Sequence, residues 1–243
     1  MESKRLNKAI SETGFCSRRE ADRLIENGKV KVNGEVVGLG VQVTAKDQIK
    51  VDGQLVTKEV PNIYLAFHKP VGITCTTDTS KKDNIVDFIN FPERIFPIGR
   101  LDKPSEGLIF MTNDGDIVNK ILRAGNNHEK EYIVNVNRKI TQAFIRQMSN
   151  GVLILDTVTK KCRVERINDF TFRIILTQGL NRQIRRMCAH LGYEVTRLKR
   201  VRIMNIELGN LKRGKYRHFT SEELKEINRL VADSSKTQEA SED

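Results

Sequence analysis

From Tyr64 onward, short runs of β-branched and aromatic residues recur through most of the chain, and only a few helical patterns separate them. The runs are IYLAFHK, LIFMT, EYIVNV, FTFRIIL and RIMNIEL, and the helical patterns lie near residues 83–90, 116–124, 141–149 and 182–191. A doubly wound fold needs a helix after almost every strand, which this order does not provide. The sequence therefore predicts an α+β domain built on a mixed, largely antiparallel sheet.

The start of the chain has a different pattern. Ser17 is followed three residues later by Glu20, which is a capping-box spacing, and an apolar helix face follows it. Asn33-Gly34 then stands between two short apolar runs, and this pair favours a hairpin with a type I′ turn. Residues 4–56 are expected to form two helices followed by a small sheet.

Two polar segments set the expected boundaries. TKEVPNI, residues 57–63, holds a proline and no periodic apolar pattern, which is typical of a linker. The last residues, SSKTQEASED, are polar and aperiodic and are expected to be disordered. We therefore predict one domain over residues 1–57, a second over 64–231 and a disordered tail over 232–243.

Positive charge is concentrated in one segment. The formal net charge is +11, and residues 178–217 carry eleven Lys or Arg residues against two acidic ones. A concentrated basic stretch rich in arginine favours binding of nucleic acid or phosphate, because neutralised phosphates release counterions. The alternative is a basic surface that only contacts solvent.

Several classes of site lack support. The four cysteines stand far apart and the histidines show no metal-ligand spacing, so neither a zinc site nor a disulfide framework is expected. Nucleotide-binding glycine motifs, the serine-esterase elbow and the zinc-peptidase motif are missing from the sequence. No apolar run is long enough for a membrane span and MESKRLNK is not a signal peptide, so we expect a cytoplasmic protein without metal or cofactor.

Asp102 stands out in the stretch FPIGRLDKPSEGLIFMTNDGD. Pro104 disfavours helical geometry at the residue before it, and Gly99 and Gly107 permit close backbone approach, so Asp102 is expected in a shaped loop. Loops on a rigid sheet often carry reactive groups. An ordinary turn carboxylate is the alternative, and the local pattern alone favours it.

A second feature is the stretch QGLNRQIRRMCAHLG. Its apolar residues recur at helical spacing, while Arg182, Arg185 and Arg186 cluster at the start of the expected helix. Three cations at the positive end of a helix dipole are unfavourable unless an anion meets them. We therefore expect a phosphate or a carboxylate at this position.

GRLDKPSEGLIFMTNDGD, HEKEY and GLNRQIRRM, in this order, are similar to motifs of the pseudouridine synthases of the RsuA/RluB/E/F branch. RLNKAISETGFCSRREADRLIENGKVKVNG resembles the S-four-type RNA-binding domain, so the resemblance covers residues 4–230. It implies isomerisation of uridine to pseudouridine in large-subunit (23S) ribosomal RNA, with a tRNA anticodon as a further candidate substrate and no cofactor. The sequence leaves the oligomeric state open, and a monomer is the default expectation.

The resemblance also implies roles for individual residues. Asp102 corresponds to the catalytic carboxylate, Arg185 to the arginine that pairs with it, and Tyr132 to the tyrosine that stacks on the flipped base. The expected substrate-binding residues around them are Arg100, Leu101, Leu176, Arg182 and Arg186. The expected RNA-binding residues are Arg5, Ser17, Arg18, Arg19, Arg197, Lys199, Arg200 and Arg202.

Two other functions remain open on the sequence. A non-catalytic RNA-binding or ribosome-assembly factor could keep the same fold. A glycosidase acting on another N-glycoside would need a second placed carboxylate, for which Glu106 is the nearest candidate in the sequence.

Overall fold

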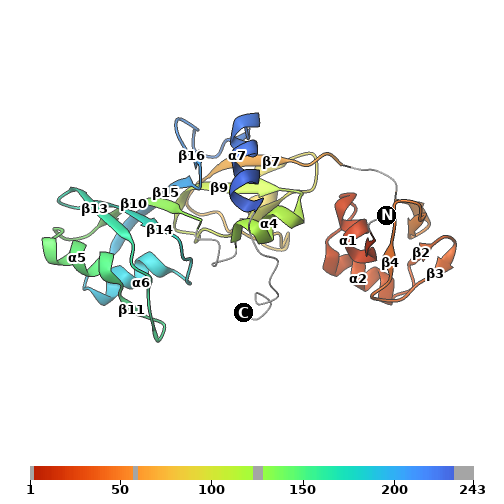
Figure 1. Cartoon of the computed structure of the whole chain (residues 1–243), viewed down its shortest axis with the longest axis horizontal. Helices are drawn as coiled ribbons and strands as arrows, with labels where there is room; N and C mark the ends of the chain where they lie inside the picture. The colour runs from red at the N-terminus through yellow and green to blue at the C-terminus, as the bar shows by residue number, and fades with distance from the viewer. Residues whose placement is uncertain (1–2, 57–59, 123–127, 233–243) are drawn as a thin grey trace. The chain divides into compact units, whose positions relative to one another are not determined.

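A computed structural model describes residues 3–56, 60–122 and 128–232 of the chain. The chain folds into two compact units. The smaller unit comprises Met1–Ile63 with Pro92–Arg94 and Asn113–Gly115, and the larger comprises the remainder (Figure 1). The expected linker falls partly on residues outside the described ones, and so does the expected tail from residue 233.

The smaller unit contains the two expected helices, which precede most of its strands. These are α1 (Leu6–Glu12) and α2 (Arg18–Glu26), and they pack on a core that includes Ile10, Ile25 and Val51. A four-stranded antiparallel sheet runs in the order β3 (Glu35–Val36), β2 (Val30–Val32), β5 (Ile49–Val51), β6 (Gln54–Leu55), and β1 (Lys4–Arg5) pairs with β4 (Gln42–Val43).

Local sequence signals explain where these elements begin and turn. The Ser17 hydroxyl accepts a hydrogen bond from the Glu20 amide at 3.1 Å, as the capping-box spacing predicted. Asn33 and Gly34 both adopt positive φ, 53° and 96°, between β2 and β3. The cap at Ser17 and the turn at Asn33-Gly34 are confirmed, while the Glu20 carboxylate accepts from Arg23 rather than from the Ser17 amide.

The larger unit is built on one mixed sheet. Its main path runs in the order β13 (Arg163–Asn168), β14 (Thr171–Leu176), β10 (Lys130–Val136), β15 (Val195–Ile203), β9 (Glu106–Thr112), β7 (Tyr64–Lys69), β17 (Tyr216–His218). Two short strands extend it, β16 (Ile206–Glu207) on β15 and β8 (Phe96–Ile98) on β9, and β11 (Leu153–Ile154) pairs separately with β12 (Thr157–Val158). Within the described sheet only β15 and β9 pair in parallel, so the prediction of an α+β fold is confirmed.

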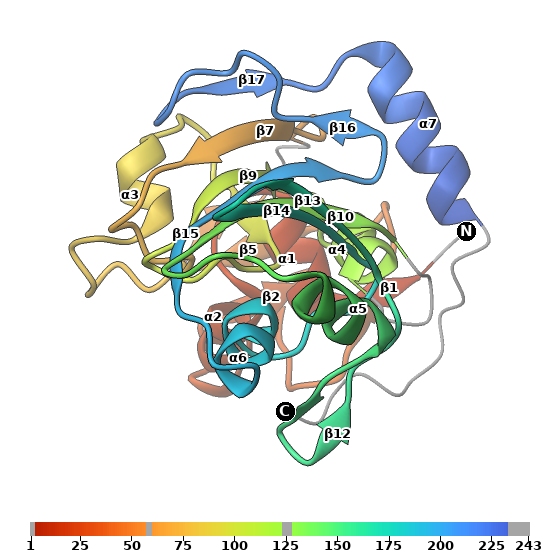
Figure 2. The ribbon, with the colours of Figure 1, turned by 90° about the vertical axis from the view of Figure 1, so that its left-hand side faces the viewer.

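Helices cover the sheet through two separate cores. The first core joins α5 (Gln142–Asn150) and α6 (Gln183–His190) to β10, β14 and β15, with Phe144 and Phe172 at its centre. The second joins α4 (Gly115–Leu122) and α7 (Ser221–Ala232) to β7 and β9. A further helix, α3 (Ile85–Ile89), packs Phe88 against Phe67. Figure 2 shows α6 and α7 on opposite sides of the sheet.

Two predictions of local structure need correction. The run RIMNIEL is not one strand, because Met204 turns the chain with a φ of 53° between β15 and β16. Helix α7 was not predicted, although its start carries a usable signal. The Glu223 amide donates to the Thr220 hydroxyl and the Glu223 carboxylate accepts from the Thr220 amide, which is a second capping box.

Candidate active site

The loop between β8 and β9 carries Asp102 and is held on both sides. The Leu101 amide donates to the Cys75 sulfur at 3.4 Å, and the Lys103 carbonyl accepts from the Gly72 amide at 2.8 Å. The Ser105 amide donates to the Asp102 carbonyl at 2.9 Å, which closes a turn directly after the carboxylate. The Asp102 side chain remains 34% exposed, so a fixed backbone presents an accessible carboxylate.

The start of α6 faces this carboxylate. Arg182 occupies the N-cap in the left-handed region with a φ of 49°, and its Nη1 lies 3.7 Å from Asp102 Oδ2. Arg185 Nε lies 3.9 Å from the same oxygen. The anion expected at the basic helix start is thus a carboxylate about eighty residues earlier in the chain. Both distances exceed hydrogen-bond length, so Asp102 is held by charge while its oxygens stay available for reaction.

Arg185 is oriented by the surrounding backbone. Its Nη1 donates to the Val195 carbonyl at 3.1 Å, and its Nη2 donates to the Pro104 carbonyl and the Ser105 hydroxyl, both at 3.2 Å. Its Nε is buried without a hydrogen-bond partner and is the atom nearest Asp102. Burial lowers the pKa of Arg185, the charge of Arg182 acts in the same direction, and Asp102 opposes both.

A buried lysine that the sequence analysis did not single out lies near this carboxylate. Lys69 ends β7 with no exposed surface, and its Nζ donates to the carbonyls of Pro70 and Ile73 at 2.9 and 2.8 Å. Burial lowers the pKa of Lys69, while Cys75 and Asp102 counteract it. The sequence signal that could have revealed it is a lysine ending an apolar strand just before a proline.

Tyr132 lies on β10 and packs half-buried against the core beneath α6. Its backbone is opposite Arg200 of β15, and the Arg200 Cζ lies 6.0 Å from the centre of the Tyr132 ring. Arg200 is only 4% exposed, and its Nε donates to the Leu108 carbonyl at 2.7 Å. Arg200 is thus buried, which argues against the predicted direct contact with RNA.

Two other arginines of β15 pair with carboxylates. Arg197 donates from Nε to the buried Glu106 at 2.9 Å, which also leaves Glu106 unsuited as the second free carboxylate of a glycosidase. Arg202 is 19% exposed, and it pairs with Glu129 and Glu131 at 2.9 Å each. Its expected role as a free RNA contact needs correction, because two carboxylates neutralise it. Lys199 is half-buried.

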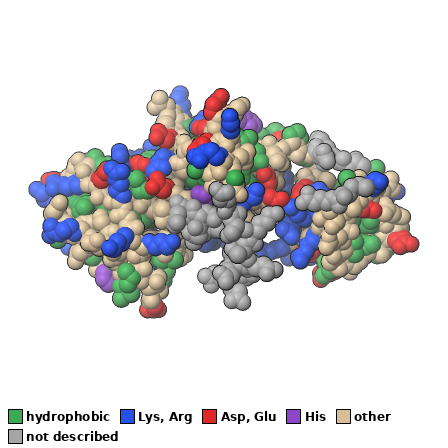
Figure 3. Space-filling view, viewed as in Figure 1, with side chains coloured by type: hydrophobic (Ala, Val, Ile, Leu, Met, Phe, Trp, Pro, Cys, Tyr) green, Lys and Arg blue, Asp and Glu red, His purple; other side chains and the backbone are tan. Residues whose placement is uncertain are grey.

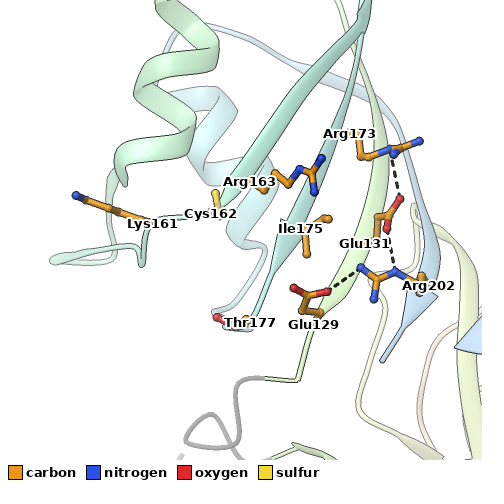
Figure 4. Close-up of a pocket in the computed structure, with 9 residues that line it drawn as sticks. All are labelled: Glu129, Glu131, Lys161, Cys162, Arg163, Arg173, Ile175, Thr177 and Arg202. Carbon is orange, nitrogen blue, oxygen red and sulfur yellow. Dashed lines mark hydrogen bonds and ion pairs between the residues drawn. The ribbon is translucent and has the colours of Figure 1, made fainter. Parts of the chain in front are cut away.

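Figure 4 shows the Arg202 pairs in a pocket of about 410 Å³, where Arg173 approaches the second oxygen of Glu131 at 3.3 Å. Basic and acidic side chains lie intermixed on the face of the larger unit drawn in Figure 3. Some cations of the basic segment, residues 178–217, are paired with carboxylates. Fewer of them are therefore free to contact phosphate than the charge of that segment indicates.

The expected substrate-binding residues divide into two groups. Leu101 and Leu176 are 7% and 4% exposed and belong to the core. Arg100, Arg182 and Arg186 are exposed, and Arg186 donates from Nε to the Asn181 carbonyl at 3.1 Å.

In the smaller unit, Arg5, Arg18 and Arg19 are exposed, whereas the Ser17 hydroxyl is occupied in capping α2. Replacing Ser17 by alanine should therefore destabilise α2 by about 1 kcal/mol, measured as faster hydrogen exchange of the amides of Arg18–Glu26. Ser17→Asn should restore protection, because asparagine also caps helices. Equal loss in both variants would contradict the capping role.

Within the described part of the chain, no helix has the length and apolar character to cross a membrane. The same residues contain no group of three or more His, Cys, Asp or Glu side chains that could hold a metal ion.

The segment that carries Asp102 and α6 matches a known protein family. Residues 63–190, more than half of the chain, match the family model described as RNA pseudouridylate synthase, and residues 4–49 match the S4 domain. The chain belongs to the RNA pseudouridylate synthase family and carries an N-terminal S4 domain.

Within this family, the dual-specificity RNA pseudouridine synthase RluF of Escherichia coli K12 is 58% identical over 235 residues, covering 96% of this chain and 81% of that protein. The stretches DNIVDFINFPERIFPIGRLD and NKILRAGNNHEKEY resemble the RluF member in particular, and this identity confirms that resemblance. Ribosomal large subunit pseudouridine synthase B of Bacillus subtilis is 36% identical, covering 96% of this chain and 98% of that one. A crystal structure of a pseudouridylate synthase superposes with a TM-score of 0.67 at 30% identity, covering 93% and 99% of the two chains.

Proposed function

We propose that the protein isomerises a specific uridine of large-subunit (23S) ribosomal RNA to pseudouridine, with Asp102 as the catalytic carboxylate. The observation that carries this proposal is the approach of Arg182 and Arg185 to the accessible Asp102, within the segment that matches the synthase family. A tRNA anticodon is the second substrate to test, because a relative is named a dual-specificity enzyme.

The chemistry that this site would perform is an isomerisation. The bond between uracil N1 and the sugar C1′ breaks, with its electron pair leaving on uracil, and a bond from C5 to C1′ forms after the base turns. The C5 proton is lost and N1 gains one, so the atoms balance without oxidant or water. A carboxylate suits this reaction, because it can attack C1′ or assist departure of the base and then leave again.

Each neighbouring group has a part in this proposal. Arg185 orients Asp102 by its charge, since its own position is determined by three hydrogen bonds. Tyr132 would stack on the target base, which must leave its helix at a cost of roughly a few kcal/mol. The exposed Arg100, Arg182 and Arg186 would meet the RNA backbone around the site.

The substrate is tested by mapping. Unmodified 23S RNA and unmodified tRNA are each incubated with the purified protein, and pseudouridine is mapped by position. One new site in 23S RNA is expected, and the same site should be lost in cells without the gene. Absence of any new pseudouridine in 23S RNA would overturn the proposed substrate. If pseudouridine appeared in tRNA alone, tRNA would be the substrate instead.

Arg185→Lys should lower the rate constant by about 10²-fold while leaving RNA affinity nearly unchanged, because an ammonium cannot make the divergent hydrogen bonds of the guanidinium. Arg229→Lys is the matched control, since Arg229 is exposed on α7, where it pairs with Glu226. Single-turnover kinetics with excess enzyme would show the contrast. Equal rates for the two variants would contradict the role of Arg185.

A further inference from the structure

Arg200 links the two halves of the sheet at the site. Its backbone is opposite Tyr132 of β10 on one side and opposite Gly107 of β9 on the other. Gly107 precedes Leu108, whose carbonyl accepts from Arg200 Nε at 2.7 Å. Arg200 therefore lies on β15 between β10, which carries Tyr132, and β9, which follows the Asp102 loop.

The guanidinium reaches both parts of the proposed site. Its Nη1 donates to the carbonyl of Arg100 at 3.4 Å, two residues before Asp102. Its Cζ lies 6.0 Å from the centre of the Tyr132 ring, within the range of a cation–π contact. One planar group thus contacts the backbone that leads to the carboxylate and the ring expected to stack on the base.

This arrangement is costly for stability. Arg200 is 4% exposed, its Nη2 is buried without a hydrogen-bond partner, and within the described ranges no carboxylate lies at ion-pair distance from its guanidinium. A buried cation held only by carbonyls and a ring costs more than a well-packed apolar side chain of similar volume. The charge of Arg200 also acts on the neighbouring Lys130. The pKa of Lys130 is lowered to about 8, mainly by burial and in part by the positive charge of Arg200. A local conflict of this kind is typical of functional sites.

We propose that Arg200 is a positioning residue, which sets the Asp102 loop and the Tyr132 ring in one fixed relation without touching the RNA. This inference rests on the function proposed above and adds a residue to it. Lysine cannot replace Arg200, because a single ammonium cannot bond the carbonyls of Leu108 and Arg100 and also present a flat face to the ring.

The test compares Arg200→Lys with Arg202→Lys in the full chain. Arg202 is two residues along the same strand and also a largely buried guanidinium, but it pairs with Glu129 and Glu131. Arg200→Lys should lower the single-turnover rate constant by about 30-fold or more, with the Kd for RNA changed by less than about threefold. Arg202→Lys should lower the melting temperature while keeping the rate constant within about threefold of the parent. Equal rate constants for the two variants, at a temperature where both are folded, would overturn the proposal.

A second readout does not depend on the substrate. The chain has four tyrosines, so the ring signals of labelled Tyr132 can be assigned by comparison with Tyr132→Phe. These signals should move in Arg200→Lys and stay in place in Arg202→Lys, because only Arg200 lies over the ring. Unmoved signals in Arg200→Lys would overturn the positioning role even if the parent modifies a different RNA. An inactive parent on 23S RNA with moved signals would instead overturn only the proposed function.

If Arg200→Lys does not fold, the contact between Arg200 and Tyr132 is tested by changing Tyr132 instead. Tyr132→Leu removes the ring and leaves the buried cation in place. The Nε–H resonance of Arg200 should then shift, because its partner across the strands is lost. An unchanged resonance would overturn the proposal.

Discussion

Replacing Asp102 by asparagine should abolish pseudouridine formation, with a fall in rate constant of at least about 10³-fold. Asparagine has nearly the same shape, but its neutral amide can neither attack C1′ nor assist loss of uracil. Single-turnover assays on unmodified RNA would measure the fall. Affinity for RNA should persist, since the exposed cations at the start of α6 remain.

The loss cannot be attributed to unfolding. The Asp102 pairs with Arg182 and Arg185 are long, 3.7 and 3.9 Å, and the carboxylate is one-third exposed, so removing its charge should change the free energy of unfolding by less than about 1 kcal/mol. Asp78→Asn is the matched control, because Asp78 is an exposed loop carboxylate that bonds to nearby Ser80. Full turnover by Asp102→Asn would contradict the assigned chemistry.

The same variant separates the enzyme from the alternative of a ribosome-assembly factor. In cells, Asp102→Asn should fail to restore the modification while still binding its RNA. If it restored the whole cellular role of the gene, the role would be binding rather than catalysis. Replacing Arg18 and Arg19 together should then be the harmful change, because both are exposed at the start of α2.

Gly107→Ala should destabilise the larger unit severely, by at least about 3 kcal/mol. A Cβ at this position would lie 2.2 Å from the Arg200 carbonyl oxygen and 2.5 Å from its amide nitrogen. The φ of +116° adds strain for any side chain. Backbone atoms in the parallel pairing of β9 with β15 cannot move aside without separating the two strands.

Urea unfolding of the full chain would measure this effect. Gly179→Ala is the matched control, because no atom lies within 4 Å of its added Cβ and its φ is not positive. The control should unfold within about 1 kcal/mol of the parent. If Gly107→Ala also unfolded within about 1 kcal/mol of the parent, the clash expected between its Cβ and the Arg200 carbonyl oxygen at 2.2 Å would be contradicted.

Local patterns were sufficient to predict much of the fold. The apolar runs, the cap at Ser17 and the turn at Asn33-Gly34 depend on neighbours within a few residues, and the structure contains them, except that RIMNIEL is divided between β15 and β16. The helix over Ser221–Ala232 was missed although Thr220 and Glu223 repeat the capping spacing. The Thr220–Glu223 spacing is thus a local signal that predicts the start of this helix.

Only part of the candidate site could be predicted from the sequence. Family motifs indicated Asp102, Tyr132 and Arg185, and the helix-start conflict required an anion near Arg185. Lys69 was missed although it ends an apolar strand just before a proline, because that local pattern does not show that β7 ends near Asp102. Arg200 was assigned to RNA binding with the rest of the basic segment, because the local sequence does not show which of these side chains is buried.

The sequence by itself determined the order of the helices and strands, the mixed sheet and the family. The tertiary structure decided which of the basic residues are free. Arg202 meets Glu131 from 71 residues away, Arg197 meets Glu106 from 91, and Arg200 reaches the Arg100 carbonyl from 100. Charge is counted along a sequence, but neutralisation and burial depend on contacts between strands far apart in the chain, so only the assembled sheet shows which cations can meet RNA.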